Sequence, residues 1–231
     1  RRMLPENPAH EFRADLRSLG LLTEKGGEFF HGCLTFPILD ENAAVAGMYG
    51  RRSSGQGLAH LYLPGPRRGV WNGAAFKAHR EIILTESIID ALSLCALGFT
   101  NAVPLYGVNG LTDDHLRLMR EHRTARTWLC FDNDPAGERT RQPAREKLEA
   151  LGVEVLDVFL PEGVKDVNEA LPKGLTAEGF RVMMVAGATA ITKTGDAPRP
   201  VGPAVEEKDG HLFISFARRR YRVSGLNQRT K

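Results

Sequence analysis

The sequence of 231 residues has few cysteines and no long apolar run. Its three cysteines, Cys33, Cys95 and Cys130, lie far apart, and no Cys-x-x-Cys pair occurs. Dispersed cysteines in odd number are typical of reduced core thiols, and without paired cysteines or clustered histidines we expect no zinc site in this chain. No stretch approaches the roughly 18 apolar residues that a membrane-spanning helix requires. We therefore expect a protein of the cytoplasm that has no membrane partner.

Charge is distributed unevenly along the chain. Residues 1–80 carry eleven Lys/Arg against seven Asp/Glu, residues 81–205 carry thirteen against eighteen, and residues 206–231 carry seven against three. Basic flanks around an acidic centre suit a metal site with neighbouring surfaces that bind a polyanion. The pattern supports such a function weakly, because asymmetry of this size also arises by chance.

Two aspartates follow an apolar stretch at residues 127–131. Asp132 and Asp134 are separated by one residue and precede a Pro-Ala-Gly turn. Residues i and i+2 of an extended backbone point to the same side, so the two carboxylates are expected side by side at a strand end. Such neighbours repel unless a cation lies between them, and Mg²⁺ is a suitable cation. The same residues also suit a plain surface turn.

A second acidic pair favours a site over a turn. Residues 81–85 are expected to form a buried strand that leads into a helix ending at Gly98. Glu86 lies at the strand-to-helix junction, and Asp90 lies one helical turn further on the same side. A further acid, Asp166, follows the strand expected over residues 153–160. Ligands of α/β sheets bind at the carboxyl ends of the strands, where these acids are expected.

The order of these motifs resembles the TOPRIM domain of bacterial replicative DNA primases, over roughly residues 30–172. The matching motifs are Glu86 with Asp90, the Phe131–Gly137 segment Phe-Asp-Asn-Asp-Pro-Ala-Gly, and Leu160-Pro161 with Lys165-Asp166. Three motifs in this order and in these strand contexts are specific, whereas a lone Asp-x-Asp is not.

The N-terminal part resembles the first half of the primase core. A Phe-Pro-Ile strand at residues 36–38 is followed by a second strand that ends in Gly50-Arg51-Arg52. Arg68 stands where the family has a lysine, and His60 or Leu61 stands near another family lysine. The resemblance implies that Arg51, Arg52, Arg68 and Lys165 contact nucleic acid or nucleotide. Without the resemblance, a solvated surface is the favoured interpretation of these arginines.

The resemblance also implies an activity and its site. The expected function is synthesis of short RNA primers on single-stranded DNA from ribonucleoside triphosphates, with a replicative helicase as a further candidate partner. The expected cofactor is Mg²⁺ or Mn²⁺. The implied metal ligands are Glu86, Asp132, Asp134 and Asp166, and the implied catalytic residues are Glu86, Asp90, Asp132 and Asp134.

The expected fold is α/β, with a mainly parallel, TOPRIM-like sheet flanked by helices and preceded by a smaller mixed α+β lobe. We place the lobe at residues 1–80 and the catalytic domain at residues 81–187. Residues 188–231 are expected to hold a Pro- and Gly-containing linker and a basic β-hairpin with an arginine-rich turn at residues 217–220. A lone hairpin is too small to be stable, so we expect it to begin a larger C-terminal region.

Three alternatives remain at this point. TOPRIM acids also serve DNA cleavage in topoisomerases and nucleases. An Asp-x-Asp after an apolar strand also resembles haloacid-dehalogenase-type phosphatases, in which Asp132 is the nucleophile. The third alternative is a non-catalytic module that binds DNA or a helicase and retains only metal binding.

Overall fold

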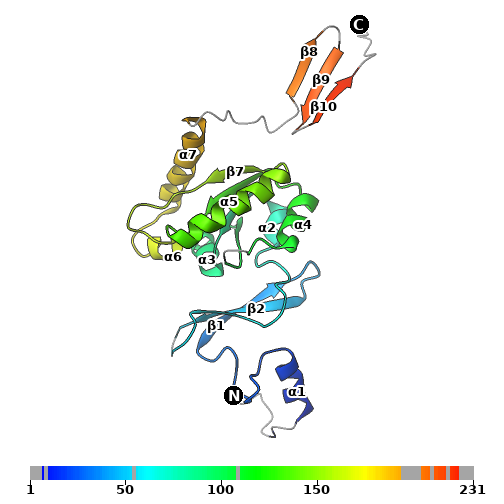
Figure 1. Ribbon diagram of the computed structural model, residues 1–231. Helices are drawn as coiled ribbons and strands as arrows, with labels where there is room; N and C mark the ends of the chain where they lie inside the picture. Colours follow the sequence, from blue (N-terminus) through cyan, green and yellow to red (C-terminus); the bar gives the residue numbers. More distant parts are fainter. Residues whose placement is uncertain are drawn as a thin grey trace.

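The computed structural model describes residue 7 and residues 10–53, 56–107, 110–193, 204–208, 211–216 and 219–223. Its largest unit is a four-stranded sheet in the order β5-β4-β6-β7, in which every neighbouring pair is parallel. The strands are β4 (Glu81–Thr85), β5 (Ala102–Pro104), β6 (Arg126–Cys130) and β7 (Glu154–Asp157). This arrangement confirms the expected α/β class with a parallel sheet (Figure 1).

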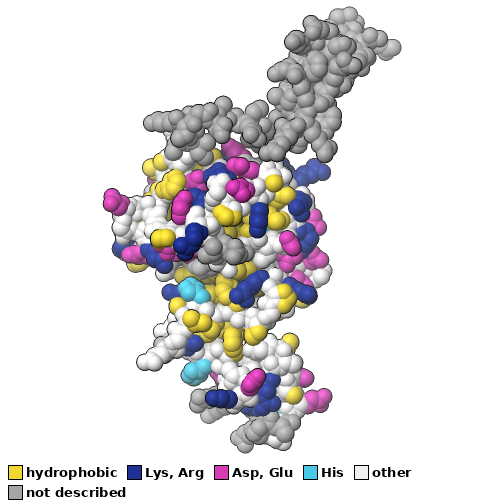
Figure 2. All heavy atoms as spheres, viewed as in Figure 1, with side chains coloured by type: hydrophobic (Ala, Val, Ile, Leu, Met, Phe, Trp, Pro, Cys, Tyr) yellow, Lys and Arg dark blue, Asp and Glu magenta, His cyan; other side chains and the backbone are white. Residues whose placement is uncertain are grey.

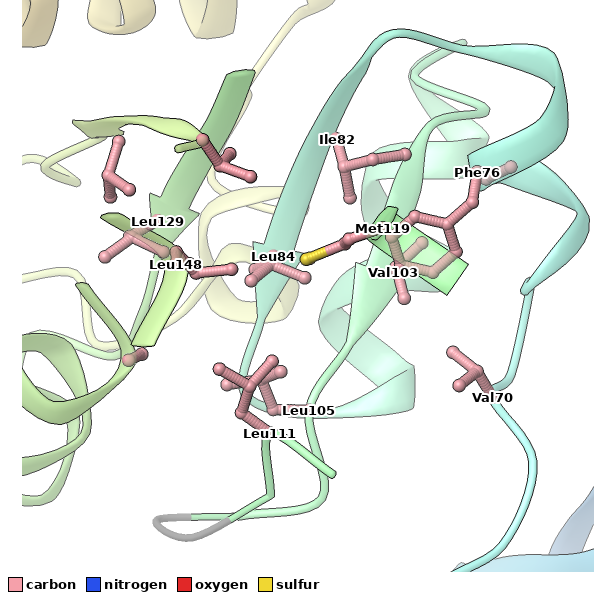
Figure 3. Packing of buried hydrophobic residues seen from close by; sticks show 14 of the residues in the cluster. Val70, Phe76, Ile82, Leu84, Val103, Leu105, Leu111, Met119, Leu129 and Leu148 are labelled. Atoms are coloured by element: carbon pink, nitrogen blue, oxygen red, sulfur yellow. The ribbon is translucent and has the colours of Figure 1, made fainter. Parts of the chain in front are cut away.

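Alternate residues of the central strands pack on opposite faces of this sheet, as strand geometry requires. Ile82 and Leu84 belong to one apolar cluster, while Ile83 belongs to the other. Figure 3 shows the first cluster, in which Leu148 and Met119 pack close to Leu84. Each Leu or Ile buried in this way contributes about 1.5–3 kcal/mol. Both faces are therefore covered, as in a doubly wound sheet.

Helices supply the other half of each cluster. The first cluster takes residues from α2 (Ala74–Ala78), α4 (Asp113–Glu121) and α5 (Pro135–Ala150). The second takes residues from α3 (Ile88–Ala96), α6 (Val167–Ala170) and α7 (Ala177–Lys193). Among the described residues no helix is both long enough and apolar enough to cross a membrane.

A smaller lobe precedes the parallel sheet. It contains α1 (Glu11–Ser18) and an antiparallel sheet of β1 (Cys33–Leu39), β2 (Val45–Arg52) and β3 (His60–Tyr62), in the order β1-β2-β3. Tyr49 and Ile38 of this lobe are buried together with Ile88 and Tyr106 of the parallel-sheet domain. In Figure 2, apolar side chains gather where the lobe meets that domain. The shared cluster therefore joins the two units.

Helix α7 continues past the point where the sequence predicts a linker. It ends at Lys193, so the expected boundary between residues 187 and 188 falls inside the helix. The reason is close packing, because a Cβ built at Gly187 lies 1.9 Å from the carbonyl oxygen of Asp157. Gly187 therefore lets α7 approach β7, and it does not end the helix.

In the described part of the C-terminal segment, three strands form an antiparallel sheet. They are β8 (Ala204–Lys208), β9 (His211–Phe216) and β10 (Arg219–Val223), in the order β10-β9-β8. The two strands of the expected hairpin are present, but Arg219 and Arg220 belong to β10 and not to the turn. Sequence reasoning missed β8, because Ala-Val-Glu-Glu-Lys is short and three of its five residues are charged.

Candidate active site at the carboxyl edge of the parallel sheet

Glu86 and Asp132 meet at the carboxyl edge of neighbouring strands. Thr85 and Cys130, the last residues of β4 and β6, are paired in register. The two acids follow within two residues of these ends, and the backbone N–H of Asp132 donates to Oε1 of Glu86 at 3.2 Å. The fold therefore joins acids that lie 46 residues apart in the chain.

Asp134 begins helix α5. Its Oδ1 accepts hydrogen bonds from the backbone N–H groups of Ala136 at 2.8 Å and Gly137 at 2.9 Å. The bond from Gly137 is the main reason why the pKa of Asp134 lies below its usual value. Asp134 therefore stays ionised, and its N-cap duty leaves Oδ2 for other partners.

Lys165 lies between the two aspartates. Its Nζ is 3.6 Å from Oδ2 of Asp132 and 3.5 Å from Oδ2 of Asp134. Asn133 fixes the backbone of this loop, because its N–H donates to the Lys165 carbonyl at 2.7 Å and its side chain donates to the Val164 carbonyl at 3.0 Å. Burial lowers the pKa of Lys165, but Asp132 and Asp134 outweigh that effect and raise it. Lys165 is therefore a charged ammonium that bridges the Asp-x-Asp pair.

The edge still carries more negative charge than Lys165 balances. Burial and then the charges of Glu86, Asp90 and Asp166 raise the pKa of Asp132 to about 7, against the attraction of Lys165. Burial also raises the pKa of Glu86, with smaller contributions from Asp134 and Asp90 and an opposing hydrogen bond from Asp132. A further cation at this edge would relieve the repulsion between these carboxylates.

Asp90 and Asp166 form hydrogen bonds that hold helix α6 beside the acid edge. Asp90 is buried, and its Oδ1 accepts the backbone N–H of Asn168 at 3.1 Å, which ties α3 to α6. Asp166 is the N-cap of α6, where its Oδ1 accepts the N–H of Glu169 at 2.7 Å. Burial raises the pKa of Asp90, and the Ser87 hydroxyl opposes this by donating to its carboxylate. Both acids therefore have structural partners in addition to any role in binding.

The arginines of the small lobe differ in their surroundings. Arg52 donates to the carbonyls of Leu58 and His31, each at 3.1 Å, and so braces its own lobe. Arg68 is exposed, and its side chain forms no hydrogen bond or ion pair with the described part of the chain. Of these two, Arg68 has the side chain that is available to an outside partner.

Arg51 belongs to a network that sequence reasoning did not find. Its Nη1 lies 2.5 Å from Nε2 of His60, and Nδ1 of His60 lies 2.9 Å from the Tyr49 hydroxyl. Because a guanidinium only donates, Nε2 accepts and neutral His60 carries its proton on Nδ1. Burial, then Arg51 and Lys165, lower the pKa of His60, so the neutral form prevails near pH 7. The network could have been found only from the pairing of Arg51 with His60 across β2 and β3. That pairing can be known only once the register of the two strands is known.

The donor set fits a divalent metal that binds together with a phosphate. Among the described residues, no three or more His, Cys, Asp or Glu side chains are already arranged to hold a metal ion. Asp134 and Asp166 each give one oxygen to a helix N-terminus, and Lys165 lies between Asp132 and Asp134. Mg²⁺ needs only one or two protein carboxylates when water and phosphate oxygens complete its shell. The edge therefore suits a metal ion that is bound jointly by protein and substrate better than one that is bound by protein ligands alone.

Comparisons with known proteins agree with this geometry. Residues 83–171 match the family described as Toprim-like. The DNA primase of Campylobacter jejuni is 31% identical over 176 residues, which cover 69% of this chain and 28% of that primase. The parallel-sheet domain of this chain has a TOPRIM-like fold, and the chain is similar to DNA primases. The TOPRIM fold, and not the haloacid-dehalogenase alternative, therefore accounts for its Asp-x-Asp motif.

Solved structures extend the likeness beyond the Toprim-like residues to the small lobe. The DnaG catalytic core has a TM-score of 0.65 at 24% identity and covers 84% of this chain and 67% of its own. A DnaG primase catalytic domain bound to single-stranded DNA has a TM-score of 0.65 at 23% identity and covers 86% of this chain and 70% of its own. The chain spans little more than a quarter of the curated primase it matches. These comparisons confirm the expected resemblance and fold class.

Proposed function

We propose that this chain is the catalytic core region of a DNA primase, which makes short RNA primers on single-stranded DNA from ribonucleoside triphosphates. The observation that carries the proposal is the meeting of Glu86, Asp132, Asp134 and Lys165 at the carboxyl edge of a TOPRIM sheet. The likeness to DNA primases supports the proposal. The cytoplasm is the compartment that such a function requires.

The site residues have distinct proposed roles. Asp132 and Asp134 hold Mg²⁺ or Mn²⁺, with Asp166 completing the set of acids on the neighbouring loop. Bound metal supplies a lowered pKa for the attacking 3′-hydroxyl and neutralises charge on the pyrophosphate leaving group. Glu86 is half-buried with a raised pKa, which suits it to take the proton of that hydroxyl. Asp90 holds Asn168 and so positions the Asp166 loop.

Lys165 has a proposed role both in the site without substrate and in the site with substrate bound. Without substrate, its ammonium offsets the repulsion between Asp132 and Asp134. Its side chain is 56% exposed, so it can turn to a substrate phosphate when a cation takes its place between the aspartates.

The proposed template and nucleotide contacts come from the small lobe. Arg68 is exposed and uncommitted, and Arg51 is held by His60, whose pKa responds to Lys165 and Asp166. The network of Arg51 therefore lies within electrostatic range of the acid edge. One structural relative binds single-stranded DNA, which supports the same partner for this chain. A replicative helicase remains a further proposed partner.

A single assay tests the proposed function. The chain is incubated with single-stranded DNA, labelled ribonucleotides and Mg²⁺, and the products are separated on a denaturing gel. Short RNA that depends on template and metal is the expected result. DNA nicks without RNA would identify a TOPRIM nuclease, and metal binding without either product would identify a non-catalytic module.

Arg68→Ala should weaken binding of single-stranded DNA and reduce its salt dependence. If Arg68 contacts one phosphate, the slope of log K against log salt falls by about one counterion. Arg120→Ala, on an exposed position of α4, is the matched control and should change neither quantity. Fluorescence anisotropy at several salt concentrations measures both. An unchanged slope in a folded Arg68→Ala protein would return Arg68 to the solvated surface.

A further inference from the structure

An open pocket of about 380 Å³ lies beside the Asp-x-Asp turn. Asp132 and Asp134 line one part of it, and Glu138 and Arg141 of α5 line another. Phe159, two residues beyond the end of β7, also lines the pocket, as do Asn133 and Pro135. One small molecule in this pocket can therefore contact the acid edge and an aromatic ring together.

Phe159 presents much of its ring to solvent. It is 52% exposed, whereas Phe131, which follows β6, is 1% exposed. The guanidinium of Arg141 lies 5.0 Å from the centre of the Phe159 ring and 5.7 Å from that of Phe131. Arg141 thus packs against both rings, while much of the Phe159 surface remains open to the pocket.

Arg141 is fixed in this position by the strands beneath it. Its Nη1 donates to Oδ1 of Asp157 at 2.7 Å and to the Leu129 carbonyl at 3.4 Å. Its buried Nε has no hydrogen-bond partner among the described residues, and the nearest carboxylate is Glu138 at 3.4 Å. The guanidinium that packs against Phe159 is therefore held in place by these bonds.

The pocket has an acidic end at Asp132 and Asp134 and an aromatic end at Phe159. The chemistry of these two ends indicates the class of ligand. A phosphate chain with its metal suits the acid edge, and a flat, partly apolar ring suits Phe159. Stacking of a base on an aromatic side chain typically strengthens binding about 5- to 100-fold and tolerates any base. We propose that Phe159 is the stacking surface for the nucleobase of a ribonucleoside triphosphate whose phosphates lie at Asp132 and Asp134. This assignment rests on the proposed function and adds a base-binding residue to it.

Binding of two probes tests the assignment. Isothermal titration calorimetry with Mg²⁺ compares ATP, which has a base, with inorganic triphosphate, which has none. Phe159→Leu should raise the Kd for ATP about 5- to 100-fold and leave the Kd for triphosphate unchanged. Phe159→Tyr keeps the ring and should stay close to wild type. Phe12→Leu, which changes a 47% exposed phenylalanine of α1, is the control and should change neither Kd.

The outcomes separate this inference from the proposed function. Equal ATP affinity in wild type and Phe159→Leu would overturn the inference, as would equal losses for both probes, because such losses point to damage at the acid edge. Failure of the wild type to bind ATP would also overturn it. If the base-dependent loss is seen but the wild type makes no RNA, the nucleobase site stands and primer synthesis fails.

Discussion

Replacing Asp132 by asparagine should abolish the proposed primer synthesis and at the same time stabilise the metal-free protein. The substitution keeps the size of the side chain but removes a charge that faces Glu86, Asp90 and Asp166. Loss of a proposed metal ligand at the reacting centre should lower the rate at least 10²-fold. Relief of carboxylate repulsion acts in the opposite direction on the fold, so activity and stability should change with opposite signs.

The pH dependence of this stability difference follows from the raised pKa of Asp132. The folded state has a pKa of about 7 against an ordinary 3.8, so it binds the proton more tightly than the unfolded state. Protonation therefore favours folding below about pH 4, and the advantage is lost as the pH rises through 7. The full difference corresponds to about 4 kcal/mol, and relaxation of the partly exposed edge should reduce it to about 1–2 kcal/mol. Asp132→Asn should gain this amount at pH 8 and almost none near pH 4.

Chemical denaturation in EDTA at several pH values measures the stability difference. Adding Mg²⁺ provides a second readout, since the wild type should melt at a higher temperature and Asp132→Asn should respond much less. Asp113→Asn, at an exposed position in the first turn of α4, should match wild type in activity, in metal-free stability and in the response of its melting temperature to Mg²⁺. A large loss of metal-free stability in Asp132→Asn would instead show that the aspartate maintains a structural turn.

The meeting of the acids could be predicted from the sequence, but the contacts that surround them could not. Glu86 and Asp132 follow short apolar strands, and parallel strands place such residues at one edge, so their meeting follows from topology. The capping role of Asp134 is local and follows from an aspartate before Pro-Ala-Gly. By contrast, the bridge from Lys165 depends on how the loop held by Asn133 folds back. No local pattern encodes that contact.

Features that depend on register or close approach were beyond the sequence. The link between Arg51 and His60 requires the pairing of β2 with β3, and a shift of one residue would place His60 on the other face. Gly187 resembles a helix end, yet it lies against β7, because only a glycine admits the Asp157 carbonyl there. Composition near residue 187 favours a linker, and tertiary packing overrides it.

Gly137, like Gly187, lies against a backbone carbonyl. We expect Gly137→Ala to damage both the fold and the activity. Helix propensity alone predicts a gain of about 1 kcal/mol for alanine in α5. However, a Cβ at this position lies 2.2 Å from the carbonyl oxygen of Asp132 and 2.7 Å from Oε1 of Glu86. The first of these atoms belongs to the backbone and cannot turn away, so α5 or the Asp132 turn must move.

Steric overlap should therefore outweigh propensity. Overpacking of this kind costs about 1–3 kcal/mol, and a displacement near 1 Å at a reacting centre can lower the rate about 10²-fold. Gly179→Ala is a matched control, because Gly179 is also the third residue of its helix and the nearest atoms to its Cβ lie 3.4 and 3.8 Å away. This control should be as stable as wild type or more stable, with unchanged activity. If Gly137→Ala behaves like Gly179→Ala in urea denaturation and primer synthesis, the close contact between α5 and the acid edge does not constrain the site.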